Sequence, residues 1–119
     1  MNDNALNIIL KELEPVFAAQ KLNRQDGDDV IYMNKTHAVK IWYNEERKLF
    51  MLDVAELNGE DSVDFVNKSM YLFDDTHNDK DAKAVGGDFV DTLNKIFGVT
   101  RGRTASVDLP TKAAPGTTP

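Results

Sequence analysis

The amino-acid sequence predicts an α+β domain in which a four-stranded antiparallel β-meander is flanked by an N-terminal helix and a C-terminal helix, followed by a disordered C-terminal tail. Apolar residues recur at helical spacing in residues 5–17 and 82–97, and β-rich segments separated by turn residues lie between them. Residues 99–119 contain three prolines and few large apolar side chains. We therefore expect residues 1–98 to form one domain and residues 99–119 to be a flexible tail or interdomain linker.

The first helix is predicted from an apolar stripe with polar side chains between its members. The stripe consists of Leu6, Ile9, Leu10, Leu13, Val16 and Phe17. Asp3 or Asn4 can cap the first turn by accepting hydrogen bonds from unpaired backbone N–H groups. Pro15 removes one helical hydrogen bond and crowds the preceding turn, so we expect a kink or a restart of the helix there.

The strands are predicted after a polar loop at residues 23–29, where helical spacing gives way to alternation. The predicted strands are Val30–Met33, Thr36–Tyr43, Lys48–Leu57 and Ser62–Phe73. Asn34-Lys35 is interpreted as a tight hairpin turn, because asparagine tolerates positive φ better than most residues. The last strand mixes apolar residues on both faces, which predicts a β-bulge around Asn67–Ser69.

Neither face of this predicted sheet is purely polar. In the second strand Val39, Ile41 and Tyr43 share one face and Trp42 lies on the other, and the third strand is apolar on both faces. We expect the two helices to cover one face. Apolar side chains on the other face, such as Trp42, Leu49 and Met51, then require a further cover, which is either a helix or a second copy of the chain.

The second helix is predicted from a second apolar stripe, which consists of Ala82, Val85, Phe89, Leu93, Ile96 and Phe97. Thr76 or Asn78 is available as its N-cap, and Gly98 occupies the position of a left-handed C-terminal cap. Gly86-Gly87 inside the helix is unfavourable for helix formation. We interpret this pair as a close approach of the helix backbone to the sheet, with a hinge or a ligand contact as the alternative.

Charge and composition exclude several classes of function. The 14 basic and 20 acidic side chains give a net charge of −6 and a pI near 4.8, so nucleic acid is a poor partner. Residues 99–119 carry +2, which leaves −8 on residues 1–98. No stretch approaches the ~18 uninterrupted apolar residues of a membrane span. The absence of cysteine excludes disulfides and thiolate metal sites and suits a cytoplasmic location.

The acidic stretch that follows the last strand is the best candidate for chemistry. Its possible divalent-cation ligands are Asp74, Asp75, His77 and Asp79. The spacing does not match a calcium-binding loop, and a strand-to-helix connection whose acids cap the second helix is the favoured interpretation. No known motif places a catalytic partner beside His37, and the sequence contains neither a glycine-rich phosphate-binding motif nor a nucleophile motif. We therefore expect that the domain is not an enzyme and that it binds no cofactor.

The sequence has two resemblances to known protein families. The runs Tyr71–Asp75, Asp79–Ala82 and Val85–Leu93 resemble an uncharacterised bacterial domain family of unknown function. The order of a helix, antiparallel strands and a helix is similar to part of the type III secretion chaperone-like fold. That resemblance implies a small acidic cytoplasmic protein that dimerises and binds partner proteins. The further strand pair and closing helix of that fold have no counterpart before residue 99.

The leading hypothesis is a non-catalytic protein-interaction or assembly module that forms a homodimer and that residues 99–119 join to another segment, as the N-terminal domain of a longer bacterial protein. Its candidate partner-binding residues are Trp42, Tyr43, Leu49 and Met51. The alternative hypothesis is a domain that binds a small ligand or a divalent cation through the acidic loops at residues 26–29 and 74–81.

Overall fold

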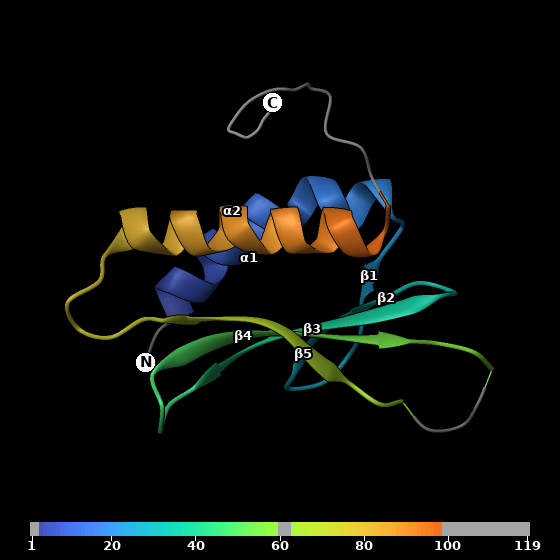
Figure 1. The fold of residues 1–119 in the computed structure, drawn as a ribbon, viewed down its shortest axis with the longest axis horizontal. Helices are drawn as coiled ribbons and strands as arrows, with labels where there is room; N and C mark the ends of the chain where they lie inside the picture. Colours follow the sequence, from blue (N-terminus) through green and yellow to red (C-terminus); the bar gives the residue numbers. More distant parts are fainter. Residues whose placement is uncertain (1–2, 60–62, 99–119) are drawn as a thin grey trace.

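The computed structural model describes residues 3–59 and 63–98, which adopt an α+β fold (Figure 1). The elements in chain order are α1 (Asp3–Ala19), β1 (Asn23–Arg24), β2 (Val30–Met33), β3 (His37–Asn44), β4 (Leu49–Glu56), β5 (Val66–Leu72) and α2 (Asp79–Ile96). The strands form one antiparallel sheet in the order β1-β2-β3-β4-β5. The predicted fold class is confirmed, and the expected tail lies outside the described residues.

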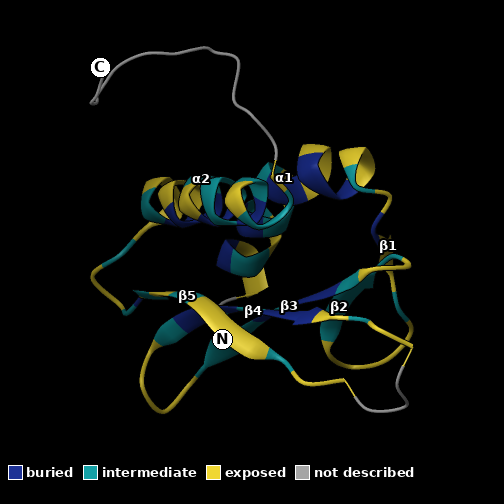
Figure 2. Ribbon diagram, turned by 45° about the vertical axis from the view of Figure 1, so that its right-hand side comes forward, coloured by how far each residue is buried: buried dark blue, intermediate teal, exposed yellow. Residues whose placement is uncertain are grey.

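The two helices lie side by side on one face of the sheet (Figures 1 and 2). Gly86 lies at their contact: a Cβ atom added there would stand 2.8 Å from the Glu12 Cβ and 3.3 Å from the Ile9 Cα. The close approach predicted for this glycine is therefore real, but it is to α1 rather than to the sheet. A Cβ on Gly87 would have no neighbour within 4 Å.

The predicted number of strands was wrong, because the sheet has five. The additional strand, β1, is a two-residue edge strand in the segment predicted as a loop, and it pairs with the end of β2. The buried Leu22 anchors its start, and the Gln25 N–H donates to the Ile31 carbonyl at 2.8 Å beyond its end. A short strand with both residues exposed has no alternation to detect. The last strand begins at Val66 rather than at residue 62.

Two local expectations are answered by the structure. Of the kink or restart expected at Pro15, the restart is absent, because α1 runs continuously through this exposed residue, while Leu13, Val16 and Phe17 around it are buried in the core. Asn34 does not act through a positive φ. Its Oδ1 accepts the N–H groups of Thr36 and His37 at 2.8 and 2.7 Å, and thereby holds the β2–β3 turn.

Other local predictions are confirmed. The register between β4 and β5 shifts opposite Leu52 and Asp53, which is the predicted bulge near Lys68. Asn78 is the N-cap of α2 and forms a capping box with Asp81. Gly98 has a φ of +70° directly after the C-cap residue.

The core lies between the helices and the inner face of the sheet (Figure 2). Its largest fully buried side chains are Phe50, Phe89, Ile9, Leu13, Ile41, Leu52, Leu93 and Val39. They come from α1, α2, β3 and β4, so the helices and the central strands share one core. Within the described residues, neither helix combines the length and the apolar character needed to cross a membrane.

Candidate functional site: the open face of the sheet

The sheet face opposite the helices is the candidate site, and we call it the open face. Side chains alternate along each strand, and the register places Trp42 opposite Met51, Met51 opposite Met70, and Leu49 opposite Leu72. Their side chains point away from the face that carries the buried Ile41, Phe50 and Leu52. The open face therefore contains Ile31, Lys40, Trp42, Leu49, Met51, Asp53, Met70 and Leu72. Neither helix covers it (Figures 1 and 2). At one end of β3 and β4, Ala38 and Ala55 alternate onto this face and are buried.

Trp42 is held in one orientation on this face. Its indole Nε1 donates to Asp53 Oδ2 at 2.7 Å, and the Lys40 Nζ lies 5.6 Å from the centre of its ring. Asp53 is itself oriented, because Asn67 Nδ2 donates to its Oδ1 at 2.9 Å. A tryptophan that is fixed before binding loses little conformational freedom when a partner packs on it.

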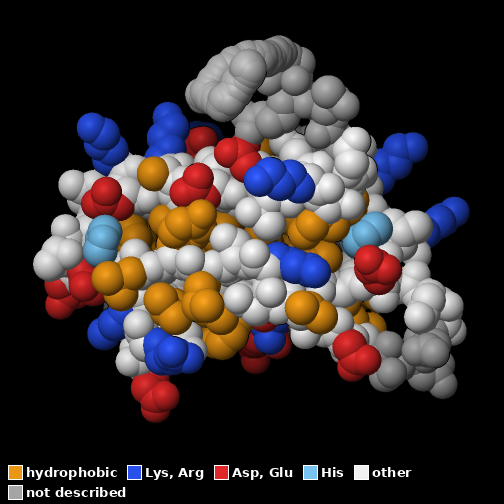
Figure 3. Space-filling model, in the orientation of Figure 1, with side chains coloured by type: hydrophobic (Ala, Val, Ile, Leu, Met, Phe, Trp, Pro, Cys, Tyr) orange, Lys and Arg blue, Asp and Glu red, His pale blue; other side chains and the backbone are white. Residues whose placement is uncertain are grey.

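The open face is most exposed along β5. Met70 and Leu72 are 52% and 53% exposed, whereas Trp42, Leu49 and Met51 are partly buried among their neighbours. Figure 3, which looks onto the β5 edge, shows hydrophobic side chains gathered along this strand and between it and α2. Adjacent apolar side chains of this kind are typical of interaction surfaces, whereas single exposed ones need no explanation.

Tyr43, a predicted partner-binding residue, lies on the opposite face. Its hydroxyl donates to the Phe73 carbonyl at 2.5 Å, and its ring packs against Phe50 with centroids 4.7 Å apart. Tyr43 therefore connects β3 to the end of β5 from the core side, and it does not belong to the open face. The other three predicted residues, Trp42, Leu49 and Met51, lie together on the open face.

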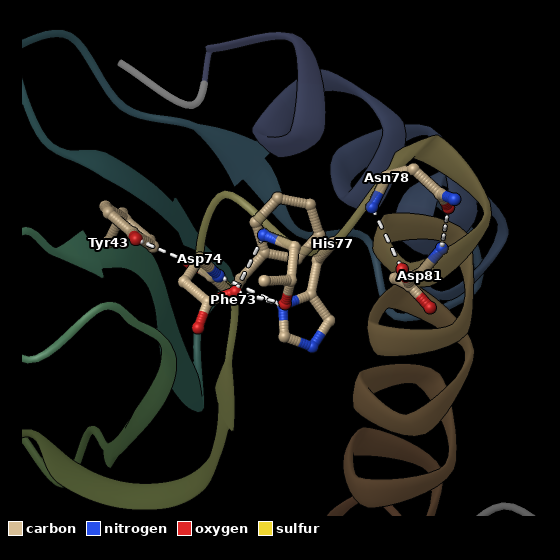
Figure 4. Close-up of polar contacts among 7 residues, drawn as sticks. Tyr43, Phe73, Asp74, His77, Asn78 and Asp81 are labelled. Carbon is tan, nitrogen blue, oxygen red and sulfur yellow. Dashed lines mark hydrogen bonds and ion pairs between the residues drawn. The ribbon is translucent and has the colours of Figure 1, made fainter.

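The acidic segment after β5 forms the connection into α2 (Figure 4). Asp74 Oδ1 accepts the Thr76 N–H and hydroxyl at 2.9 and 2.5 Å and lies 2.9 Å from His77 Nδ1. The hydrogen bonds from the Thr76 hydroxyl and backbone hold the pKa of Asp74 below its ordinary value, with a smaller contribution from His77. The His77 ring also stacks on Phe73.

The remaining candidate ligands do not converge on Asp74. Asp75 is exposed, and Asp79 Oδ1 accepts from Asn4 Nδ2 at 3.0 Å, which ties the start of α2 to α1. The acidic loop at residues 26–29 lies between β1 and β2, at the other end of the strand order. In residues 3–59 and 63–98, no three acidic or histidine side chains are placed to hold a metal ion.

His37 has structural contacts. Its Nδ1 lies 2.8 Å from the Thr36 hydroxyl, and its ring meets Phe97 edge-on at 4.8 Å. The histidine thus packs the end of α2 against the start of β3. No acidic side chain contacts this imidazole among the hydrogen bonds of the described residues.

Sequence reasoning did not single out Asp53, Met70 and Leu72. Asp53 is recognisable only when its strand pairing is known, because it contacts Trp42 diagonally across two strands. Met70 and Leu72 follow the bulge that changes the face of the residues before it. Alternation alone puts Met70 and Leu72 on one face of their strand, and only the pairing with β4 shows that this is the face of Met51.

Comparison with known protein families, curated proteins and solved structures finds no match to this chain.

Proposed function

We propose that this domain is a non-catalytic protein-interaction module and that the open face is its contact surface. The observation that carries the proposal is the oriented Trp42, fixed by Asp53 at 2.7 Å at the centre of an apolar sheet face. Tryptophan is enriched among residues that dominate binding energy, and such residues are usually surrounded by contacts that exclude water. Met51, Leu49 and Met70 supply that surrounding apolar surface.

The partner that fits best is an amphipathic helix of another protein. The inner face of the same sheet is covered by two helices through aliphatic and aromatic side chains, and the open face offers side chains of the same kind. A helix packed there would complete a helix–sheet–helix arrangement in which both faces of the sheet are buried. Lys40 on this face favours an acidic residue at the margin of the helix.

A capture experiment tests this proposal with the full chain as bait. We compare the wild type with Met51→Lys, which places a charge on the open face, and with Lys83→Glu, a control on the exposed side of α2. The wild type and the control are expected to retain a genuine partner in similar amounts, whereas Met51→Lys is expected to lower the amount retained at least about tenfold. The partner is then purified and its affinity measured directly by calorimetry, because capture alone does not establish a specific contact.

Two results would overturn the proposal. One is a folded Met51→Lys protein that binds the purified partner as tightly as the wild type does. The other is a partner whose binding is lost in the Lys83→Glu control and kept in Met51→Lys, which would move the contact to the helices. A circular dichroism spectrum identical to the wild type establishes folding for each variant.

A further inference from the structure

Strand β5 forms one edge of the sheet, and no described strand pairs with its outer side (Figure 1). It has seven residues, and among them only Lys68 is charged. The opposite edge is β1, which has two residues. Long apolar edges are usually protected, because their unpaired backbone groups bind other strands.

The backbone groups that β5 presents outward can be assigned from the register. The Phe73 N–H donates to the Lys48 carbonyl at 2.8 Å, so residues 48 and 73 form a hydrogen-bonded pair. Hydrogen-bonded and non-hydrogen-bonded pairs alternate in an antiparallel ladder. The N–H and C=O groups of Met70 and Leu72 consequently point away from β4, towards the free edge.

Exposed apolar side chains gather on the same strand. Within the described residues, the large hydrophobic side chains that are most exposed are Val66, Met70, Leu72 and Val63, and the first three belong to β5. Met70 and Leu72 thus combine outward backbone groups with side chains that are more than half exposed. The bulge and Lys68 protect only the other half of the strand.

The charges near the two ends of β5 favour antiparallel over parallel pairing of two β5 strands. Lys68 lies near the start of the strand, and Asp74 and Asp75 follow directly after its end. An antiparallel arrangement of two β5 strands centred on Tyr71 sets Met70 opposite Leu72. It also brings Lys68, which lies at the bulge, near the acidic residues that follow β5 in the second copy. A parallel, in-register arrangement would instead set Lys68 opposite Lys68, which is unfavourable.

We propose that two copies of this chain join through antiparallel pairing of their β5 strands, which merges two five-stranded sheets into one continuous sheet. The pairing is closed, because each copy uses the same edge and β1 is too short to extend the assembly. The open faces of both copies then form one surface. This inference extends the proposed function to self-assembly, but it uses the edge of the sheet rather than its face.

Light scattering coupled to size exclusion tests the pairing over a hundredfold range of concentration of the full chain. The wild type is expected to reach twice 13.3 kDa at the upper end. Lys68→Glu is expected to raise the dimer dissociation constant at least about tenfold by placing like charges near each other, whereas Lys35→Glu in the β2–β3 turn leaves it unchanged. Met70→Pro, which removes an N–H that β4 does not use, is expected to give a monomer.

Cysteine cross-linking tests the register, since the chain has no cysteine of its own. A mixture of Met70→Cys and Leu72→Cys proteins is expected to form a disulfide-linked dimer several times faster than either variant alone, because these positions lie opposite each other between copies. A mixture of Glu45→Cys and Arg47→Cys, both in the exposed β3–β4 turn, is the control. Equal cross-linking in all samples would contradict the proposed register.

Edge pairing is overturned by a wild type that remains monomeric at every concentration. It is also overturned by a dimer that Met51→Lys disrupts and Lys68→Glu leaves intact, since that dimer would be held by the open face. Neither result decides the proposed function, which depends on the effect of Met51→Lys on binding of another protein. Conversely, a result that overturns the proposed function does not change how the measured mass depends on protein concentration, so it does not decide edge pairing.

Discussion

The indole N–H of Trp42 donates to the carboxylate of Asp53 at 2.7 Å across the β3–β4 pair. The two residues are diagonal neighbours, since Lys40 is directly opposite Asp53 and Met51 is directly opposite Trp42. This contact links a charged residue on the open face to the orientation of its largest apolar side chain. Because the chain has one tryptophan, its fluorescence reports on this face alone.

Substitution of Asp53 is expected to release Trp42. Asp53→Ala removes the acceptor, so the indole ring gains freedom and tryptophan fluorescence anisotropy falls. The hydrogen bond is only partly buried, and its loss should cost about 1 kcal/mol of the free energy of unfolding, measured by urea denaturation. Glu45→Ala, in the exposed β3–β4 turn, serves as the control. Unchanged anisotropy in Asp53→Ala would mean that neighbouring side chains, rather than the hydrogen bond, hold the ring.

The two adjacent glycines of α2 are expected to respond oppositely to alanine. Gly86→Ala places a Cβ 2.8 Å from the Glu12 Cβ and should destabilise the domain by about 1–3 kcal/mol through forced separation of the helices. Gly87→Ala meets no atom within 4 Å and should stabilise it by up to ~1 kcal/mol, because alanine favours the helix. Chemical denaturation of both variants measures the difference. Equal effects would contradict the close helix contact at Gly86.

The sequence predicted the features that depend on local periodicity. The apolar stripes of α1 and α2, the capping role of Asn78 and the bulge near Lys68 all leave a pattern within a few residues. Strand β1 leaves none, because two exposed polar residues on an edge need no alternation. Their pairing depends on the chain returning past β2, which is a tertiary effect.

The candidate site was predictable only in part, for a related reason. Alternation separates Trp42 from Tyr43, but it does not indicate which of the two faces the helices cover. That choice depends on where α1 and α2 pack, and it placed Tyr43 in the core and Trp42 on the open face. Likewise, the contact of Gly86 with Glu12 depends on how the two helices pack, which helical spacing alone does not reveal.

Asn78 is expected to matter more than its exposed position suggests. Its Oδ1 accepts the N–H groups of Lys80 and Asp81 at 3.0 and 3.2 Å, while Asp81 accepts the Asn78 N–H at 2.9 Å. Asn78→Ala should lower the free energy of unfolding by about 0.5–2 kcal/mol, whereas Asn78→Ser should retain most of it. Thermal or chemical denaturation distinguishes the two. Equal losses in both variants would show that the side-chain acceptor is not responsible.

Asp74 is expected to link stability to pH in the acid range. Hydrogen bonds from Thr76, aided by His77, hold its pKa in the folded protein below the ordinary value of 3.8. The folded state therefore binds this proton less readily than the unfolded state does. The resulting contribution to stability is complete above the ordinary pKa and is lost as the pH falls through the lower, folded value.

Thr76→Ala tests the cause of this shift. It removes the hydroxyl donor to Asp74 while the backbone N–H remains, so the pKa of Asp74 should rise towards 3.8 without reaching it. Thr76→Ser keeps a hydroxyl and should preserve the lowered pKa. Titration of the Asp74 carboxyl carbon by NMR measures both. If the pKa stays equally low in Thr76→Ala, then the backbone N–H and His77 suffice to maintain it, and the pH dependence of stability should be the same in the two variants.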